Sequence, residues 1–248
     1  MTNLDSLHNR CNIAVIGASG GIGSAFVKCL ANDDGVAAVH AFSRSPQQSA
    51  HPKVTCGVLD LSEEASIAAA AQAAAAQSAL DLVVVATGIL HRETSLTPEK
   101  TLRAFDRDAM LEVMEVNSIG PALVAKHFLP RLVRQRKAVF AVLSARVGSI
   151  ADNRLGGWAG YRMSKAALNM LVRTVAIEQT RASADAVVVA LHPGTVDTAL
   201  SAPFSGRVES AKLFSAEQSV ARLIGTINAL QVTDTGGFFA YDGSRIDF

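Results

Sequence analysis

The sequence predicts an α/β protein with one doubly wound parallel sheet of about seven strands and with helices on both faces of that sheet. Short runs of β-branched residues alternate with longer segments of helical periodicity, which is typical of successive βαβ units. The strand-like runs are apolar at nearly every position, as strands covered on both faces must be. A glycine-rich turn follows the first run and precedes the first helical segment. Together these observations indicate the doubly wound arrangement.

The elements follow in order along the chain. Strands are expected at residues 13–16, 38–42, 54–56, 82–86, 138–143, 186–191 and 237–240. Helices are expected at residues 21–30, 62–78, 107–132, 161–180 and 216–229. The second helix is mostly alanine, the best helix former, and Ser62 followed by two glutamates provides its start signal. No linker rich in Pro, Gly or Ser divides the chain, so residues 1–248 are expected to form one domain.

The composition is that of a soluble globular protein, because 49% of the residues are hydrophobic and 18% are charged. The net charge is +1, and the densest basic run, RLVRQRK at residues 131–137, is expected at a helix end, where cations complement the helix dipole. This interpretation disfavours a nucleic-acid surface. No apolar run approaches the roughly 20 residues that span a bilayer, and the N-terminus lacks a signal-peptide pattern, so a cytoplasmic protein is expected.

The cysteines and histidines do not form a metal-binding pattern. Cys11, Cys29 and Cys56 lie in apolar surroundings without CxxC spacing, and the six histidines also lack metal-ligand spacing. The cysteines are expected to be buried thiols in a reducing compartment. We therefore expect neither disulfides nor a metal site.

The glycine-rich turn GASGGIG at residues 17–23 predicts a dinucleotide site. Glycines at such a turn let backbone amides approach a pyrophosphate, and the helix that begins there supplies a favourable dipole. The spacing is GxxxGxG, and no Lys-Ser or Lys-Thr follows that would make a nucleotide-triphosphate loop. The alternative is a turn that is merely tight. The residues expected to border a cofactor here are Gly17, Ser19, Gly20, Gly21, Ile22 and Gly23.

The end of the second predicted strand bears on the choice between NAD and NADP. In dinucleotide folds an acidic residue about 20 positions after the turn binds the ribose of NAD, while a nearby arginine accepts the 2′-phosphate of NADP. Ser43 and Arg44 stand at this place and no carboxylate does. The sequence therefore favours NADP over NAD, although an arginine at a strand end is common on any protein surface.

The segment YRMSK at residues 161–165 places a phenol and an ammonium on one helix face, because Tyr161 and Lys165 are four residues apart. A phenol has an ordinary pKa of about 10, and a nearby cation lowers that value. The pair therefore fits a role in proton transfer. Taken alone, the spacing describes an ordinary pair on a half-buried helix face equally well.

In combination, the motifs GASGGIG, YRMSK and LHPGTVDT resemble the short-chain dehydrogenase/reductase family over almost the whole chain. Two further segments, LSARVGSIADNRLGGW and GGFFAYDGSRIDF, are similar to its C-factor and Sniffer-type carbonyl reductase subgroup. The resemblance implies a Rossmann fold, a nicotinamide cofactor, and hydride transfer between that cofactor and a small-molecule carbonyl or secondary alcohol. It also implies a homodimer or homotetramer packed through the long helices.

The resemblance implies roles for individual residues. Tyr161 would exchange a proton with the substrate, Lys165 would lower the pKa of Tyr161 and hold the nicotinamide ribose, and Asn117 would help to position a relay water. Asn117 could instead merely bond a neighbouring strand, and the Pro-Gly pair below could be only a turn. The further residues implied to contact the cofactor are Asp60 and Leu61 at the adenine, Ala86, Thr87 and Gly88 at its ribose, and Pro193, Gly194, Val196 and Thr198 near the nicotinamide.

The chain departs from the family pattern at the serine that polarises the substrate carbonyl. That serine usually stands third before a glycine after the fifth strand, and Gly148 puts this position at Ala145. Ser144 precedes the position by one residue, and Ser149 follows the glycine. A shift of one residue turns a side chain to the other face of a strand, although a bulge at a strand end re-aims it. We expect Ser144 rather than Ser149 to polarise the substrate carbonyl, and we expect slower turnover if neither serine does so.

Two functions of different classes follow from these features. The favoured one is an NAD(P)-dependent oxidoreductase that prefers NADP and can also use NAD. Residues 201–214 are expected to form a lid over its substrate, because this long irregular connection mixes apolar and polar side chains. The alternative is a C-factor-like signalling or regulatory protein with vestigial turnover, which the alanine at position 145 suggests. His91 and Arg92 follow the segment ATGIL, and a place in a solvated loop is favoured for them over a place facing the substrate.

Overall fold

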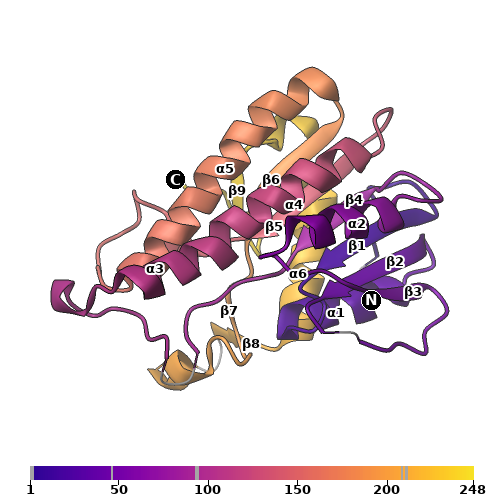
Figure 1. The fold of residues 1–248 in the computed structure, drawn as a ribbon. Helices are drawn as coiled ribbons and strands as arrows, with labels where there is room; N and C mark the ends of the chain where they lie inside the picture. The colour runs from indigo at the N-terminus through magenta and orange to yellow at the C-terminus, as the bar shows by residue number, and fades with distance from the viewer. Residues whose placement is uncertain (1–2, 46, 93–94, 208, 210–211) are drawn as a thin grey trace.

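Seven parallel strands form the central sheet of the computed structural model, which describes residues 3–45, 47–92, 95–207, 209 and 212–248 (Figure 1). The strands are β1 (Cys11–Ile16), β2 (Val36–Ser43), β3 (Val54–Val58), β4 (Leu82–Val85), β5 (Ala138–Leu143), β6 (Ala186–His192) and β9 (Phe238–Ala240). Their order across the sheet is β3-β2-β1-β4-β5-β6-β9, which confirms the predicted doubly wound fold. The strand order reverses between β1 and β4, and doubly wound folds bind ligands at the carboxyl ends of such a pair.

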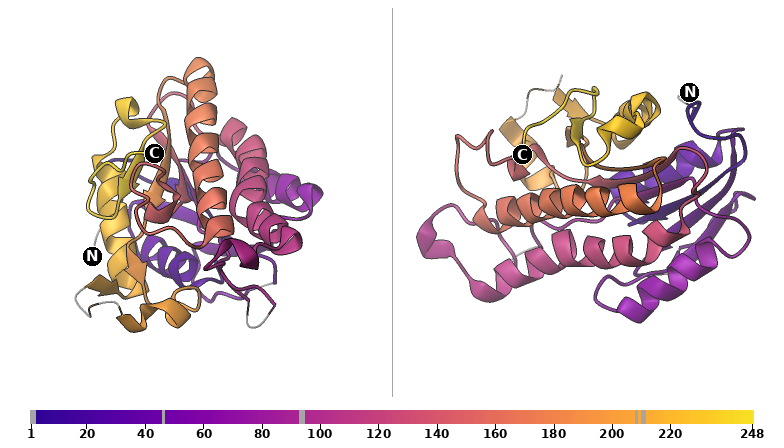
Figure 2. Two further views of the ribbon diagram at one scale, coloured as in Figure 1. Left: turned by 90° about the vertical axis from the view of Figure 1, so that its left-hand side faces the viewer. Right: turned by 90° about the horizontal axis from the view of Figure 1, so that it is seen from above.

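Helices cover both faces of the sheet, as Figure 2 shows. They are α1 (Gly21–Ala31), α2 (Glu64–Ala74), α3 (Arg107–Met114), α4 (Gly120–Phe128), α5 (Ala159–Ala182) and α6 (Ala216–Ala229). The helices α1 and α6 contribute to the hydrophobic core on one face, and α2, α4 and α5 contribute to the core on the other. In β1, Ile13 and Val15 join the first core while Ala14 and Ile16 join the second, because side chains alternate along a strand.

The helical run predicted at residues 107–132 contains a π-helical turn. This turn, Glu115–Ile119, separates α3 from α4, and a 3₁₀ turn at Leu129–Arg131 ends the run. Pro121 lacks the N–H that would bond the carbonyl of Asn117 in an α-helix, so the regular hydrogen-bond pattern cannot continue there. The widened turn holds Asn117 at its centre.

The helix α2 begins at Glu64, two residues later than predicted. Ser62 does not cap it, because the Ser62 amide and hydroxyl both donate to Asp60 Oδ1, at 3.0 and 2.8 Å. These bonds hold Ser62 in a turn that precedes the helix. Because Asp60 engages the Ser62 side chain, Ser62 does not cap the helix, and α2 begins at Glu64.

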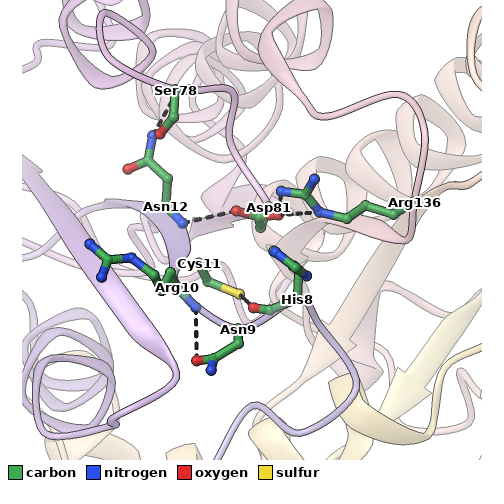
Figure 3. Close-up of polar contacts among 8 residues, drawn as sticks. All are labelled: His8, Asn9, Arg10, Cys11, Asn12, Ser78, Asp81 and Arg136. Atoms are coloured by element: carbon green, nitrogen blue, oxygen red, sulfur yellow. Dashed lines mark hydrogen bonds and ion pairs between the residues drawn. The ribbon is translucent and has the colours of Figure 1, made fainter.

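The basic run at residues 131–137 lies mostly beyond the helix end, which corrects the expectation that its cations complement the helix dipole. Arg136 instead donates from Nη2 and Nε to Asp81 Oδ1, at 2.8 and 3.1 Å (Figure 3). The other oxygen, Asp81 Oδ2, accepts from the backbone amide of Asn12 at 2.9 Å. Asp81 is only 2% exposed. The run therefore supplies a cation that stabilises the amino ends of β1 and β4.

The three cysteines are free thiols of unequal burial. Cys11 is buried, its Sγ donates to the His8 carbonyl at 2.6 Å (Figure 3), and burial raises its pKa to about 12. Cys29 and Cys56 are only partly buried, contrary to expectation. Over the described ranges, no helix combines the length and apolar character needed to cross a membrane.

Candidate active site

Two adjoining cavities open at the carboxyl ends of the strands, beside the switch point between β1 and β4. Their volumes are about 490 and 360 Å³. Both are lined by Gly20, His91 and residues 86–89, so they form one continuous cleft. The first cavity extends to Arg44 at the end of β2, and the second extends to Tyr161 on α5.

The glycine turn between β1 and α1 lies where the two cavities meet. Gly17 has φ +86°, a left-handed conformation that favours glycine, and a Cβ on Gly23 would overlap the Gly17 carbonyl oxygen. The helix α1 starts after Gly20 without a side-chain cap, and its first residues, Gly21 and Ile22, line the second cavity. Uncapped amides at a helix N-terminus suit an anionic group.

The outer end of the first cavity brings together the residues predicted at the adenosine. Ser43, Arg44, Asp60 and Leu61 all line it, and so does Ser62. Hydrogen bonds from the Ser62 amide and hydroxyl lower the pKa of the Asp60 carboxyl, and the Arg44 guanidinium lowers it further. The Ser43 hydroxyl is buried and donates to the Ser45 carbonyl at 2.6 Å. Arg44 is exposed and is the cation at this end of the cleft.

Residues 86–88, which directly follow β4 and which the resemblance places at the cofactor ribose, line both cavities. The Oγ1 of Thr87 is buried and has no hydrogen-bond partner in the part of the chain that the structure describes. A buried hydroxyl without a partner is unfavourable, so this atom is ready to bond a ligand in the cleft. A Cβ on Gly88 would lie 3.5 Å from Asn117 Oδ1 and 3.6 Å from Lys165 Nζ, so Gly88 stands beside both predicted site residues.

Tyr161 and Lys165 lie on the first turns of α5 and are both buried, at 8% and 3% exposed. Lys165 Nζ donates to the Leu143 carbonyl at 2.9 Å and lies 5.9 Å from the centre of the Tyr161 ring. Burial lowers the pKa of Lys165 to about 8 and raises the pKa of Tyr161 above its ordinary value. The expected lowering of the tyrosine pKa is therefore absent from this arrangement, because removal of the phenol from water dominates.

Asn117 is fully buried and bonds the segment after β4 rather than lining either cavity. Its Nδ2 donates to the Ile89 carbonyl at 2.8 Å, and its Oδ1 accepts from the Ile89 amide at 2.8 Å. Nδ2 also lies 3.0 Å from Ser164 Oγ. Asn117 thus joins the π-helical turn, the strand end and α5.

The three candidates at the serine position have different surroundings. Ser144 lines the second cavity, but its hydroxyl donates to Asn169 Oδ1 at 2.7 Å. Ser149 is buried, and its Oγ accepts from the Asp152 amide at 3.1 Å. Ala145 packs in the small hydrophobic cluster that contains Tyr161. The arrangement does not support either serine as the carbonyl donor, because the one hydrogen of the Ser144 hydroxyl is donated to Asn169 and Ser149 lines neither cavity.

Most of the predicted cofactor residues line the cleft, and three do not. Gly23 lies behind the turn, and Val196 is buried in β7 (Thr195–Val196). Gly194 has φ +80°, and a Cβ there would lie 2.8 Å from the Phe214 ring. The predicted residues that do line the second cavity after β6 are Pro193 and Thr198. The three exceptions shape the backbone around the cleft.

The candidate site from the sequence did not include the part of the cleft formed by residues 89–92 and 199–200, and it kept His91 and Arg92 only as a less favoured alternative. His91, interpreted as solvated, lines both cavities, and its Nε2 lies 3.0 Å from the Ala199 carbonyl oxygen. Its ring also meets Phe204 edge-on, with 5.6 Å between centroids. The position of His91 three residues after Gly88, at the carboxyl end of a central strand, was the available signal.

The connection predicted as a lid is fixed at its base. Its last two residues form β8 (Leu213–Phe214), which pairs in parallel with β7, the strand that precedes it, and a 3₁₀ segment at Ala202–Arg207 carries Phe204. Phe204 packs against Trp158, with 4.9 Å between ring centroids. Residues 208, 210 and 211 of the predicted 201–214 lid lie outside the described residues.

Comparison with known proteins identifies the family of this chain and several proteins that are similar to it in sequence or structure. A family model described as short chain dehydrogenase matches residues 12–208. The C-signal of Myxococcus xanthus is 34% identical over 137 residues, which cover 55% of this chain and 77% of that protein. An NADPH-bound carbonyl reductase from chicken fatty liver is 28% identical, with 98% of this chain and 97% of that chain covered and a TM-score of 0.84. The carbonyl reductase Sniffer of D. melanogaster, 22% identical with 97% and 100% covered and a TM-score of 0.82, is similar in fold.

Proposed function

The chain belongs to the short-chain dehydrogenase family, and from this premise we propose that it is an NADP(H)-dependent oxidoreductase that interconverts a small carbonyl compound and the corresponding secondary alcohol. The observation that carries the proposal is the continuous cleft between the glycine turn and the buried pair Tyr161 and Lys165. A dinucleotide has two ends, and the cleft offers a different chemical environment to each. The cofactor supplies or accepts the hydride when bound.

The residues of the cleft fit this cofactor. The uncapped start of α1 suits a pyrophosphate, and the buried Thr87 hydroxyl offers a hydrogen bond that the protein itself does not use within the described residues. Arg44 stands where a 2′-phosphate would be recognised, and Ser43 before it carries no charge to repel one. The NADPH-bound state of the similar chicken carbonyl reductase supports the same preference.

Tyr161 acts as the proton donor when a carbonyl is reduced. Burial raises its pKa, so the phenol stays protonated at neutral pH and is able to give its proton to the substrate oxygen. Hydride adds to the carbonyl carbon, the C=O π bond breaks, and the proton from Tyr161 Oη completes the alcohol. The Lys165 ammonium, one helical turn away, stabilises the phenolate that remains.

Asn117 and the end of β5 position these groups. Asn117 fixes the backbone at Ile89, which lines the cleft beside Gly88, through two hydrogen bonds. The Leu143 carbonyl holds the Lys165 ammonium at 2.9 Å. Neither contact requires a serine, so the site is able to work with Tyr161 as the principal donor to the substrate oxygen.

The regulatory alternative is the weaker hypothesis. The similarity to the C-signal and the alanine at position 145 are its support. Against it, Tyr161, Lys165 and Asn117 are all present and buried around an accessible cleft, an arrangement that binding of the nucleotide alone does not need. The enzyme is therefore favoured.

The proposal is tested by Tyr161→Phe, with Tyr241→Phe as the control, because these are the two tyrosines of the chain. The first variant should lower kcat by about 10²–10⁴ on an aldehyde and ketone panel with NADPH, and leave the Kd for NADPH unchanged. Tyr241→Phe should keep its kcat. Near-normal turnover by Tyr161→Phe would remove Tyr161 as the acid, and a wild-type protein inactive on the whole panel would argue for the regulatory alternative.

A further inference from the structure

A left-handed turn of three residues directly precedes the helix that carries Tyr161. Gly156, Gly157 and Trp158 have φ values of +63°, +68° and +53°. Glycine accepts such values readily, but Trp158 has a Cβ and adopts this conformation only where its surroundings impose it. The tryptophan is the N-cap residue of α5, three positions before Tyr161. Something outside this local segment must hold the turn.

Glu99, which lies 61 residues before Gly160 in the sequence, makes the first set of contacts with this turn. Its carboxylate oxygens Oε1 and Oε2 accept from the Gly160 amide, at 3.2 and 3.1 Å, and its backbone carbonyl accepts from the Trp158 amide at 2.5 Å. The glutamate is only 8% exposed, although a glutamate is rarely buried. A carboxylate at the start of a helix is favoured by the helix dipole, which offsets part of the cost of burial.

Arg162 makes the second set of contacts, with the carbonyl groups of the same turn. Its Nε donates to the Gly157 carbonyl at 2.9 Å, its Nη2 to the Gly156 carbonyl at 3.1 Å, and its Nη1 to the Val147 carbonyl at 3.3 Å. Val147 lies between Ala145 and Gly148, at the end of β5 where the family serine would stand. The guanidinium therefore joins the turn to the other side of the site.

The geometry points to Glu99 and Arg162 as positioning residues that hold the first turn of α5 and thereby fix Tyr161 against the substrate end of the cleft. Glu99 holds Gly160, the residue next to Tyr161, and the Trp158 ring lies 6.4 Å from the Tyr161 ring. The catalytic part of this inference rests on the function proposed above. The structural part concerns the turn alone and has its own readout, because Trp158 is the single tryptophan of the chain.

The test compares Glu99→Ala and Glu99→Gln in the whole chain with the control Glu178→Gln. Glu178 is an exposed glutamate on α5, the helix that carries Gly160 and Tyr161. Loss of the carboxylate should shift Trp158 emission to longer wavelength and raise its quenching by acrylamide. It should also lower kcat by about 10²-fold, since a misplacement of about 1 Å has this effect, while the Kd for NADPH stays unchanged. Glu99→Gln keeps one oxygen that accepts from Gly160 and should lose less activity. Glu178→Gln should match the wild type in every measurement.

Gly160 offers a sharper test of the same contact. A Cβ on Gly160 would lie 2.6 Å from Glu99 Oε1, so Gly160→Ala should displace the carboxylate and reproduce the effects of Glu99→Ala. Once the carboxylate is gone, the added methyl group has nothing to displace, and Gly160→Ala should cost no further activity in the Glu99→Ala background. Additive losses in the double variant would contradict the positioning role.

The outcomes separate this inference from the proposed function. Folded Glu99→Ala with unchanged emission and unchanged kcat would overturn the positioning role while leaving Tyr161 as the acid. A wild-type protein without turnover, whose Trp158 emission nevertheless responds as expected to Glu99→Ala and Gly160→Ala, would overturn the proposed function and keep the role of Glu99 in the turn. If Glu99→Ala does not fold, the same comparison is made with Glu99→Gln and Gly160→Ala.

Discussion

Ser144 donates its hydroxyl hydrogen to Asn169 Oδ1 across 2.7 Å, at a point where strand β5 meets helix α5. Asn169 in turn donates from Nδ2 to the Gly148 carbonyl at 3.3 Å. A serine hydroxyl has one hydrogen, so Ser144 cannot donate to a substrate carbonyl while this bond exists. The serine nearest to the family position therefore ties the strand end to the helix.

Ala145→Ser should raise kcat for carbonyl reduction. Ala145 packs in the cluster that contains Tyr161, so a hydroxyl there would stand on the same side as the phenol. Removal of one such donor costs about 10²–10³ in kcat elsewhere, and we expect at least about a tenfold gain here. Initial rates with NADPH on one aldehyde measure the effect.

Ser144→Ala is the matched comparison for that gain. It removes the bond to Asn169 and should lower the free energy of unfolding by about 1 kcal/mol, with little change in kcat. If instead Ser144→Ala lowers kcat as strongly as loss of a carbonyl donor would, Ser144 turns toward the substrate during catalysis and the present interpretation is wrong.

Lys165 should make stability depend on pH in a predictable direction. Burial lowers its pKa to about 8 from an ordinary value of 10.5. Between these values the unfolded chain binds the proton and the folded protein does not, so the free energy of unfolding rises with pH by up to about 1.4 kcal/mol per pH unit. Well below pH 8 both states bind the proton, and this contribution no longer changes with pH.

Urea unfolding of the wild type and of Lys165→Met isolates this effect. The wild type should gain stability relative to the variant from about pH 8 to pH 10, and their difference should be constant below about pH 7. Burial also raises the pKa values of Tyr161 and Cys11, which opposes stability at high pH, but both residues are present in both proteins. A difference that stays constant up to pH 10 would mean that Lys165 titrates as it does in water.

The sheet could be predicted from the sequence because its signals are local. Each strand of a parallel sheet is buried on both faces, so a short apolar run is sufficient, and the runs at 138–143 and 186–191 match β5 and β6 to within one residue. The glycine turn is also local, since its fingerprint lies within seven residues. The small pair β7 and β8 was missed because each strand is only two residues long.

The contacts that shape the site are long-range, and the sequence pattern does not encode them. Glu99 meets Gly160 across 61 positions, and Ser144 meets Asn169 across 25. The pKa of Tyr161 likewise depends on how completely α5 buries the phenol, which the four-residue spacing to Lys165 does not reveal. Sequence reasoning therefore identified which residues gather at the cleft but not which of their polar atoms remain free.

Asp81→Ala should destabilise the protein more than any change in the exposed part of the basic run. The Asp81 carboxylate is buried and joins the Asn12 amide to Arg136. Removing one partner of such a buried group costs about 3 kcal/mol, whereas the exposed control Arg134→Ala should change the free energy of unfolding by about 0.5 kcal/mol or less. Urea unfolding at pH 7 measures both, and equal effects would show that the Asp81 contacts contribute little.

Arg44→Leu should convert the proposed preference for NADP into equal binding of the two cofactors. Arg44 is the exposed cation at the adenosine end of the cleft, where Asp60 is already engaged by Ser62 and Ser43 by Ser45. Hydrogen bonds to a charged group contribute about 1.5–3 kcal/mol, so the Kd for NADP should rise by roughly 10- to 100-fold. The Kd for NAD, which has no 2′-phosphate, should stay the same.

Titration calorimetry of the wild type, Arg44→Leu and the exposed control Arg107→Leu gives these constants. Equal losses for both cofactors would mean that Arg44 acts through the general field of the cleft, and tighter binding of NAD than NADP by the wild type would reverse the assignment.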